Sequence, residues 1–389
     1  MRVVFFAQTI PDPCGAFFHD VAMARELQRR GHSAIFAITG KTPQGRTGVY
    51  RGVQWKHYTM CEREFAGANI WCTPHFPFLK LVRRLNEKFQ KPILATMHFG
   101  ENTEYITEYQ RLGKWTEILW IISDHIKNHV LNTVKISPAI KIVESTRPLM
   151  LENEVKFNEY GVLPTGDCIT MVNANILKGL PIFLQLAKRF PDKKFLGIRP
   201  YYNRIQVPEN IPNIEWVNIQ EDIRNVLSRT RIMVVPSLYE SWGRVAFESM
   251  YNGIPVLHSR PFERTDSRAR PSGSTEGMME WIQDTQFACS QDNIEEWVEA
   301  INTLDNPDTY AEYSRKAYDQ TYAMKIFEDF SIIEQKLVDY ANTYPSPVNL
   351  TAGPQSQVQQ VPPSATGMRM PAGQGSALPF RGGRFSVRR

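Results

Sequence analysis

Short apolar runs alternate with segments of helical periodicity along most of the chain, and this alternation constrains the fold more than any other feature. The runs at 3–7, 34–38 and 92–98 are typical of buried strands, whereas 17–32 and 78–89 have apolar residues at helical spacing. Strands that alternate with helices form parallel sheets, because each helix carries the chain back to the start of the next strand. The pattern therefore predicts an α/β fold.

The alternation occurs twice, on either side of the irregular segment 145–168, which contains Pro148 and Pro164. The remaining strand candidates are 69–71, 140–144, 168–174, 194–198, 214–217, 231–236 and 255–259, and the remaining helix candidates are 112–132, 180–190, 221–229, 294–304 and 309–341. Two consecutive Rossmann-like domains that face a cleft are the simplest architecture for this order. We predict an N-terminal domain at 1–150, a C-terminal domain at 165–330 and a closing helix at 331–344.

The composition changes at Pro345. The segment 345–389 is rich in proline and glycine, and it contains five arginines but no Lys, Asp or Glu. Few apolar residues remain to offset the entropy lost on ordering, so we predict a disordered tail. The end of this segment is similar to RGG-type sequences, which leaves two interpretations: a solvated tail, or one that contacts an acidic surface such as nucleic acid. Without the tail the charges balance, so the folded part gives no charge-based reason to bind nucleic acid.

The cysteines and the hydropathy indicate the cellular compartment in which such a chain is found. Five cysteines without a C-x-x-C pair are typical of free thiols in a reducing compartment. The apolar run at 3–7 is too short for a signal peptide, and the run at 118–122 is too short to span a bilayer. We expect a cytoplasmic protein without a transmembrane segment.

The stretch 236–259, PSLYESWGRVAFESMYNGIPVLHS, follows a buried strand and contains two glutamates, Glu240 and Glu248. Glu240 falls in a loop at the carboxyl end of the strand, where ligands bind in open α/β sheets. Glu248 falls outside the apolar arc of the helix that follows, so its simplest interpretation is an exposed polar face. Alternatively, both carboxylates accept hydrogen bonds from the hydroxyls of a nucleotide sugar.

This stretch resembles the E-x7-E signature of the family-4-type retaining glycosyltransferases, which have the GT-B fold. The segment MVNANILKGLPIFLQLAKRF resembles the opening of that family's nucleotide domain, and residues 1–37 resemble the opening of its acceptor domain. The similarity extends over roughly residues 1–330. The resemblance implies an enzyme that moves a sugar from a nucleotide-diphosphate donor to an acceptor hydroxyl.

The resemblance also implies roles for individual residues. Glu248 would bind the ribose hydroxyls of the donor, and Glu240 would hold the donor sugar. Trp242 and Gly243 would supply backbone N–H groups to the sugar and phosphates. Lys178, in the Lys-Gly pair, would contact the diphosphate, where a fixed positive charge stabilises the leaving group; its alternative is a solvated lysine.

Three further residues extend this predicted site. The resemblance places Gly15 close to the phosphates and His98 near the anomeric region of the donor; the alternatives are an ordinary turn glycine and a structural histidine. The family usually has a glycine-rich turn where this chain has Arg199, which suggests an additional phosphate contact or a different loop. Another departure follows strand 255–259, where a longer, arginine-rich segment replaces a G-G-x-x-E turn and leaves Gly273 and Glu276 as its counterparts.

The chain contains no D-x-D motif, which holds a divalent metal in the other major glycosyltransferase fold. We therefore expect no metal and no cofactor, with Lys178 and a helix N-terminus in their place. The resemblance implies transfer with retention of configuration. The acceptor stays open among a glycan, a lipid intermediate, a protein side chain and a hydroxylated DNA base. The alternatives to a transferase are a catalytically silent GT-B binding protein and, with less support, a sugar phosphorylase or epimerase.

Overall fold

The computed structural model describes residues 1–12, 14–42, 45–74, 79–100, 115–200, 206–263, 266–268 and 270–346. The predicted disordered tail at 345–389 lies outside these ranges except for its first two residues. Of these, Ser346 is buried and donates a hydrogen bond from Oγ to the backbone oxygen of Phe89 at 2.9 Å. The packed part of the chain therefore includes Ser346, which lies beyond the expected boundary. No helix in the described ranges has both the length and the apolar character needed to cross a membrane.

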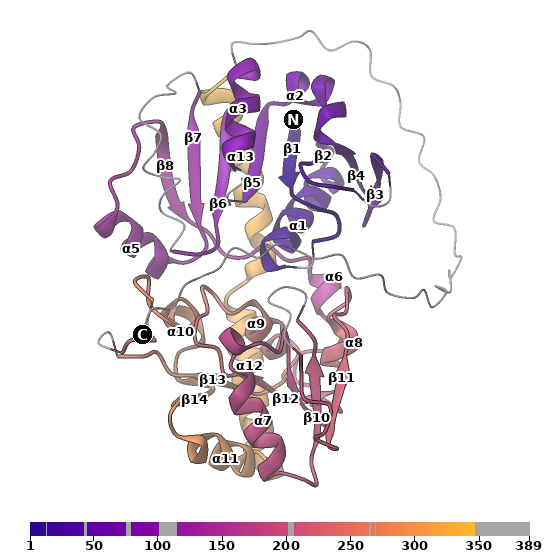
Figure 1. Ribbon diagram of the computed structural model, residues 1–389, viewed down its shortest axis with the longest axis vertical. Coiled ribbons are helices and arrows are strands. Elements are labelled where there is room, and N and C mark those ends of the chain that lie inside the picture. The colour runs from indigo at the N-terminus through magenta and orange to yellow at the C-terminus, as the bar shows by residue number, and fades with distance from the viewer. Residues whose placement is uncertain are drawn as a thin grey trace. The chain divides into compact units, whose positions relative to one another are not determined.

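The first sheet has eight strands in the order β3-β4-β2-β1-β5-β6-β7-β8, and every neighbouring pair is parallel except β3 with β4 (Figure 1). Its strands are β1 (Arg2–Ala7), β2 (Ser33–Ile38), β3 (Thr47–Tyr50), β4 (Val53–His57), β5 (Ile70–Pro74), β6 (Ile93–Met97), β7 (Glu117–Ile121) and β8 (Ile140–Ser145). The β3–β4 hairpin was not apparent from the apolar runs, because exposed residues alternate with partly buried ones in β3 and with buried ones at the start of β4.

One sequence-based prediction in this region is wrong. The segment 112–132 was expected to be a single helix, but its described part, 115–132, forms strand β7 followed by helix α5 (Asp124–Thr133). All five residues of β7 are buried because the strand lies inside a parallel sheet with helices on both faces. A short continuous apolar run cannot be distinguished from a buried helix by its periodicity alone.

The helices of the first sheet are distributed over both faces. Helices α2 (Glu62–Gly67), α3 (Leu79–Phe89) and α5 share one core with the sheet, and α1 (Gly15–Arg29) and α13 (Asp329–Thr343) share the other. The short helices η1 (Tyr58–Met60) and α6 (Glu152–Val155) complete this part.

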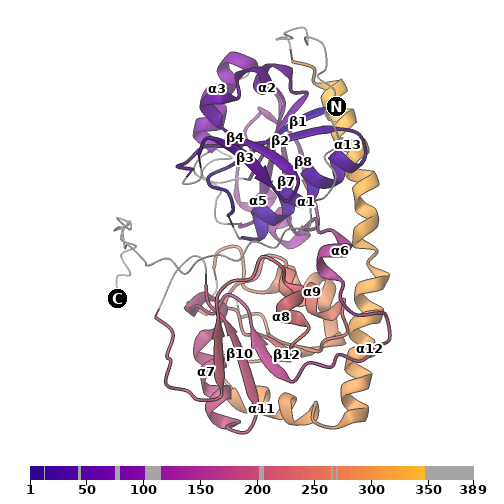
Figure 2. The ribbon, with the colours of Figure 1, turned by 90° about the vertical axis from the view of Figure 1, so that its right-hand side faces the viewer.

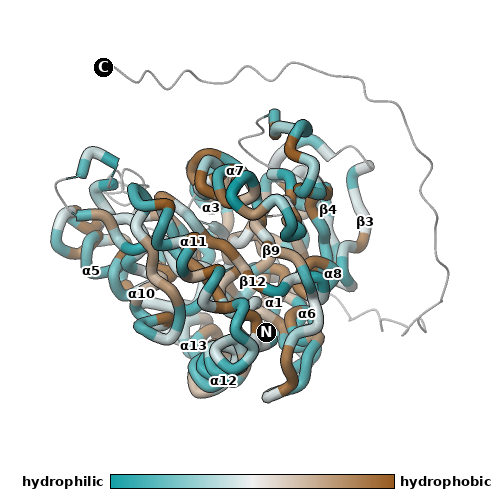
Figure 3. Tube along the Cα trace, turned by 90° about the horizontal axis from the view of Figure 1, so that it is seen from below, coloured by the Kyte–Doolittle hydropathy of each residue, from teal (hydrophilic) through white to brown (hydrophobic). Residues whose placement is uncertain are grey.

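The second sheet has six parallel strands in the order β11-β10-β9-β12-β13-β14. Its strands are β9 (Cys168–Met171), β10 (Lys194–Ile198), β11 (Ile214–Val217), β12 (Thr230–Val235), β13 (Val256–Ser259) and β14 (Phe287–Cys289). The helices are η2 (Ile176–Lys178), α7 (Leu180–Arg189), α8 (Arg224–Leu227), α9 (Arg244–Met250), α10 (Glu276–Ile282), η3 (Gln283–Thr285), α11 (Ile294–Thr303), α12 (Pro307–Ala323) and η4 (Ile326–Glu328). Helices α7 and α11 pack on one face, and α9 and α12 on the other. In Figure 3, α12 is coloured mainly as hydrophilic, as expected for a helix at the surface.

The last helix of the chain returns to the first sheet. Figure 2 shows the chain passing from α12, beside the second sheet, to α13, beside the first. The apolar side chains of α13 belong to the core around β1 and α1, and they are Phe330, Ile333, Leu337 and Tyr340. Arg147, just after β8, holds this return by donating to Asp329 Oδ2 at 2.8 Å and Oδ1 at 2.5 Å. Both sheets lie within one compact unit.

Candidate active site

The loop between β12 and α9 begins at the carboxyl end of a buried strand and ends at Gly243, as the strand–loop–helix prediction required. Gly243 is the residue before α9 and has a φ of 78°, which favours glycine. A Cβ atom at this position would lie 2.5 Å from Met278 Sδ, so the side chain of α10 also requires glycine here. The loop is therefore held both by its backbone conformation and by its packing against α10.

Glu240 lies in this loop and contacts Lys178. Glu240 Oε1 accepts a hydrogen bond from Lys178 Nζ at 2.5 Å and another from Ser237 Oγ at 2.7 Å. Its backbone N–H donates to the carbonyl of Ser274 at 2.8 Å. Glu240 is 8% exposed, so this ion pair is largely shielded from water. The structure thus brings together two of the three residues that were predicted to be catalytic.

The position of Lys178 follows from the turn around it. Asn175 accepts a hydrogen bond from the Lys178 backbone N–H through Oδ1 at 3.1 Å. Gly179 has a φ of 83°, and a Cβ atom there would lie 1.9 Å from the backbone oxygen of Pro236. This close backbone approach joins the start of α7 to the end of β12, and it places Lys178 beside the Glu240 loop.

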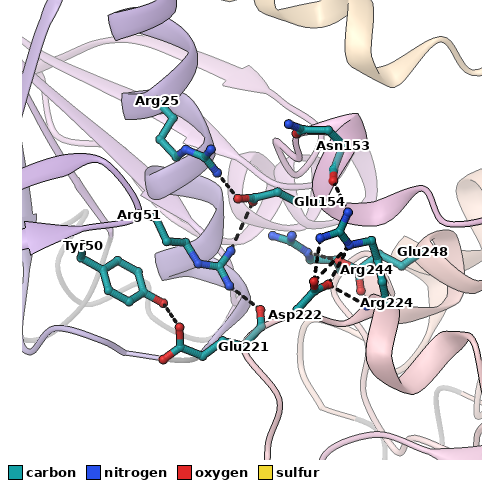
Figure 4. Close-up of polar contacts among 10 residues, drawn as sticks. All are labelled: Arg25, Tyr50, Arg51, Asn153, Glu154, Glu221, Asp222, Arg224, Arg244 and Glu248. Carbon is teal, nitrogen blue, oxygen red and sulfur yellow. Dashed lines mark hydrogen bonds and ion pairs between the residues drawn. The ribbon is translucent and has the colours of Figure 1, made fainter. Parts of the chain in front are cut away.

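Glu248 is buried, so the interpretation of an exposed polar face is wrong. It is 5% exposed, and its Oε1 accepts a hydrogen bond from Arg244 Nε at 2.6 Å, one helical turn earlier (Figure 4). The guanidinium of Arg244 lies over the ring of Phe18, 5.8 Å from its centroid, and so reaches from α9 to α1 of the first sheet. Periodicity identified the polar side of the α9 segment but did not show that this side packs against the other domain.

His98 directly follows β6 and lies close to a second histidine that the sequence analysis did not single out. The rings of His98 and His19 are 5.4 Å apart in an edge-to-face arrangement. Burial, and then the positive charge of Arg244, lower the pKa of His98 to about 3. Burial first, then His98 and Arg244, lower the pKa of His19 as well. Both rings are therefore neutral at physiological pH. His19 is fully buried in the middle of α1. In the sequence, the only feature that could have identified it was a polar residue at a core position of the helix.

The remaining predicted residues lie in different surroundings. Gly15 begins α1, and a Cβ atom there would meet no other atom within 4 Å, so its backbone faces open space. Arg199 follows β10 and donates to Glu209 Oε1 at 2.8 Å. The Trp242 side chain is 4% exposed and stacks on Trp281 at a centroid distance of 5.1 Å. Only backbone groups of Trp242 can meet a ligand, and its carbonyl already accepts a hydrogen bond from Trp281 Nε1 at 2.7 Å.

The arginine-rich segment after β13 contributes to the same loop. Gly273 has a φ of 97°, and Glu276 accepts a hydrogen bond from the backbone N–H of Ser274. The carbonyl of Ser274 is the acceptor that fixes the Glu240 backbone. Arg270 places its guanidinium 4.7 Å from the ring centroid of Tyr239, the neighbour of Glu240. This segment thus supports the loop, although its sequence differs from the expected turn.

A charged network connects the first sheet to the second (Figure 4). Arg51, in the β3–β4 turn, donates to Glu154 Oε2 at 3.2 Å and to the backbone oxygen of Glu221. Arg25 of α1 also pairs with Glu154, and Arg224 donates to the backbone oxygen of Asn153 at 2.8 Å. These contacts bring α1, the β3–β4 turn and α8 together around the short helix α6.

Comparison with known protein families identifies part of the chain. Residues 200–320, which contain the Glu240 loop and α9, match the family described as glycosyl transferases group 1. No curated protein sequence matches the chain significantly.

Several solved structures share its fold. Sucrose-phosphate synthase from Thermosynechococcus elongatus aligns over 88% of this chain and 100% of its own, with a TM-score of 0.65 and 12% identity. Anabaena HepE, solved with UDP and glucose, covers the same shares with a TM-score of 0.64 and 13% identity. The catalytic domain of starch synthase IV from Arabidopsis thaliana, bound to ADP and acarbose, covers 88% of this chain and 99% of its own, with a TM-score of 0.56 and 10% identity. The chain thus has the predicted GT-B fold, and its residues 200–320 are similar to the group 1 glycosyl transferases.

Proposed function

We propose that this chain, with its GT-B fold and its group 1 glycosyltransferase domain, transfers a sugar from a nucleotide-diphosphate donor to an acceptor hydroxyl with retention of configuration. The observation that carries the proposal is the contact between Lys178 and Glu240 beside the carboxyl end of β12. A cation and a carboxylate are held together there, and a second buried carboxylate, Glu248, lies on the helix that follows.

The chemistry of a nucleotide sugar fits these groups. The diphosphate carries negative charge that increases as it leaves, and Lys178 supplies a fixed positive charge for it. Sugar and ribose hydroxyls are hydrogen-bond donors, and a carboxylate is purely an acceptor. We infer that Glu240 holds the donor sugar and that Glu248 holds the ribose. We also infer that Gly15 and the backbone N–H groups of Trp242 and Gly243 meet the phosphates, and that Arg199 adds a positive charge at the carboxyl end of β10.

The proposed reaction is direct exchange at the anomeric carbon. The acceptor oxygen forms a bond to this carbon on the face from which the diphosphate oxygen departs, and the departing phosphate oxygen takes the acceptor proton. Configuration is retained because attack and departure share one face. The low pKa of His98 keeps its ring neutral, so it can exchange hydrogen bonds with the sugar without adding a charge. Lys178 takes the place of a metal, and the reaction uses no cofactor.

The acceptor is a glycan, a lipid intermediate, a protein side chain or a hydroxylated base. We also propose a cytoplasmic location, which the five cysteines support: each is a free thiol, and four of them are buried.

The test of this function is the effect of Glu248→Gln on donor binding. Gln has nearly the same shape but has lost the charge, and hydrogen bonds to a charged group contribute about 1.5–3 kcal/mol, so donor affinity should fall about 10- to 100-fold. The donor is identified by screening a panel of UDP-, ADP- and GDP-sugars, with thermal shift to detect binding and release of the nucleoside diphosphate to detect turnover. Isothermal titration then measures the affinity of the identified donor.

Glu295→Gln is the control, because Glu295 is an exposed carboxylate that pairs with Arg189 outside the site. Equal donor affinity in Glu248→Gln and wild type would contradict the proposed site. A wild-type protein that binds a nucleotide sugar and never releases its sugar to any acceptor or to water would favour the catalytically silent binding protein instead.

A further inference from the structure

Three buried nitrogen atoms without a hydrogen-bond partner lie where α1, the end of β6 and α9 come together. They are His19 Nε2, His98 Nε2 and Arg244 Nη1, and none has a partner among the residues that the structure describes. A buried polar group that is left unpaired loses its hydrogen bonds to water without replacement, so such groups are rare in folded proteins. Three of them in one place indicate that something else satisfies them.

These atoms belong to side chains that adjoin one another. The edge-to-face contact joins the two imidazole rings, and the guanidinium of Arg244 lies over Phe18, the residue before His19. The charge of Arg244 is close enough to lower the pKa of both histidines. The group therefore combines residues from both Rossmann-like domains.

Two of the three atoms are hydrogen-bond donors. The backbone N–H of Leu149 donates to His19 Nδ1 at 3.0 Å, so Nδ1 is the acceptor and carries no proton. Since burial keeps this ring neutral, its single proton is on Nε2. Arg244 is always protonated and already uses Nε for Glu248. A neutral N–H and a cationic N–H thus lie in the same group of side chains, and each lacks an acceptor among the described residues.

We propose that His19 and Arg244 together bind an anionic oxygen of the sugar donor. An anionic oxygen fits because it only accepts hydrogen bonds and because one of the two donors is positively charged. Two parts of a donor supply this chemistry: the diphosphate, or the carboxylate of an acidic sugar. The inference rests on the proposed function and adds two residues to its site, one from each domain, so that a bound donor holds the domains together.

To identify the source of the oxygen, the affinities of wild type and Arg244→Gln are measured by titration with nucleotide ligands. For each of three nucleotide bases, the ligands are the nucleoside diphosphate, its glucose ester and its glucuronate ester. The bases are uracil, adenine and guanine. Loss of a charge-assisted hydrogen bond should weaken binding about 10- to 100-fold. A loss with the nucleoside diphosphate itself assigns the oxygen to the diphosphate. A loss with the glucuronate ester alone assigns it to the sugar carboxylate.

Arg244→Lys provides a second variant, because it keeps the charge but lacks the atom that occupies the Nη1 position. It should show most of the loss. Arg51→Gln is the matched control: Arg51 also places its guanidinium over Phe18, at 5.1 Å, and also joins the two domains, but its N–H groups have protein acceptors. Its donor affinity should stay within about twofold of wild type.

Two substitutions of His19 separate ligand binding from a structural role. The Asn oxygen takes the position of Nδ1 and can still accept from Leu149, but nothing replaces Nε2; the Gln amide nitrogen reaches the Nε2 position and gives up the Leu149 contact. Ligand binding requires His19→Asn to lose more donor affinity than His19→Gln. If His19→Gln instead loses more donor affinity and more thermal stability than His19→Asn, the role of His19 is structural. The proposal that His19 binds the donor would then be overturned.

Unchanged affinity for all ligands in both Arg244 variants would overturn the inference while leaving the proposed function intact. A wild-type protein that binds none of the nine ligands would overturn both.

Discussion

At the scale of single residues, the pairing of Lys178 with Glu240 defines the candidate site. Lys178 has a quarter of its side chain exposed, whereas the Glu240 side chain is 9% exposed, so ligand-accessible charge comes mainly from the lysine. A donor diphosphate that competes with Glu240 for Lys178 would release the carboxylate to accept hydrogen bonds from the sugar. The ligand-free pair thus keeps both groups in place for the reaction.

Lys178→Met tests this pairing. We expect kcat to fall about 100- to 1,000-fold, because one fixed charge at the leaving group is lost. Donor affinity should change less, since the ribose contact that we propose for Glu248 does not involve Lys178. Steady-state kinetics with the identified donor measures both, and Lys178→Arg should recover part of the rate. A Lys178→Met enzyme with normal kcat would remove Lys178 from the chemistry.

At the scale of elements, the site depends on how closely the start of α7 approaches the end of β12. The contact is between two backbones, and the positive φ of Gly179 permits the turn that makes it. A contact made through apolar side chains would hold these two loops farther apart. The position of Lys178, at the end of η2 and just before α7, is therefore fixed by Gly179 rather than by packing in the hydrophobic core.

Gly179→Ala should reduce the free energy of unfolding by about 2–4 kcal/mol, because it combines a left-handed conformation with a steric overlap. Gly161→Ala is a close control: Gly161 has a φ of 82°, but its nearest neighbour would be Arg315 Nη1 at 4.0 Å. This control should cost about 1 kcal/mol. Urea denaturation compares the two, and equal losses would mean that the contact with Pro236 is unimportant.

At the scale of the whole molecule, the chain completes its first domain with its last described helix. The apolar residues of α13 fill the core beside α1, although the second sheet is formed in between. The two domains are therefore joined twice, by the segment after β8 and by the return from α12. The Arg147–Asp329 ion pair links these two connections.

Leu337→Ala should therefore destabilise the molecule although it lies near the end of the described residues. Leu337 is fully buried, and truncating such a residue costs about 2–5 kcal/mol. Ile332, on the same helix, is 60% exposed, so Ile332→Ala should change stability by less than about 0.5 kcal/mol. Thermal denaturation of both variants is the measurement. Similar melting temperatures would show that α13 contributes little to the first domain.

The sequence by itself determined the α/β class, the two Rossmann-like parts and the loop that carries Glu240, because apolar periodicity and glycine positions act locally. It located Lys178 only through resemblance, and it left Glu248 open between an exposed helix face and a contact with a nucleotide sugar. The helix expected at 112–132 was wrong, since an apolar run such as 118–122 looks alike in a buried strand and a buried helix.

The tertiary structure alone decided which polar residues meet. Glu248 looked like part of an exposed face, but it is buried and pairs with Arg244, whose guanidinium lies over Phe18 of α1. His19 and Arg244 are far apart in the chain, and the resemblance implied no role for either of them. Their proximity depends on how one domain packs on the other, and burial, hydrogen-bond partners and pKa values all follow from that packing rather than from any local pattern.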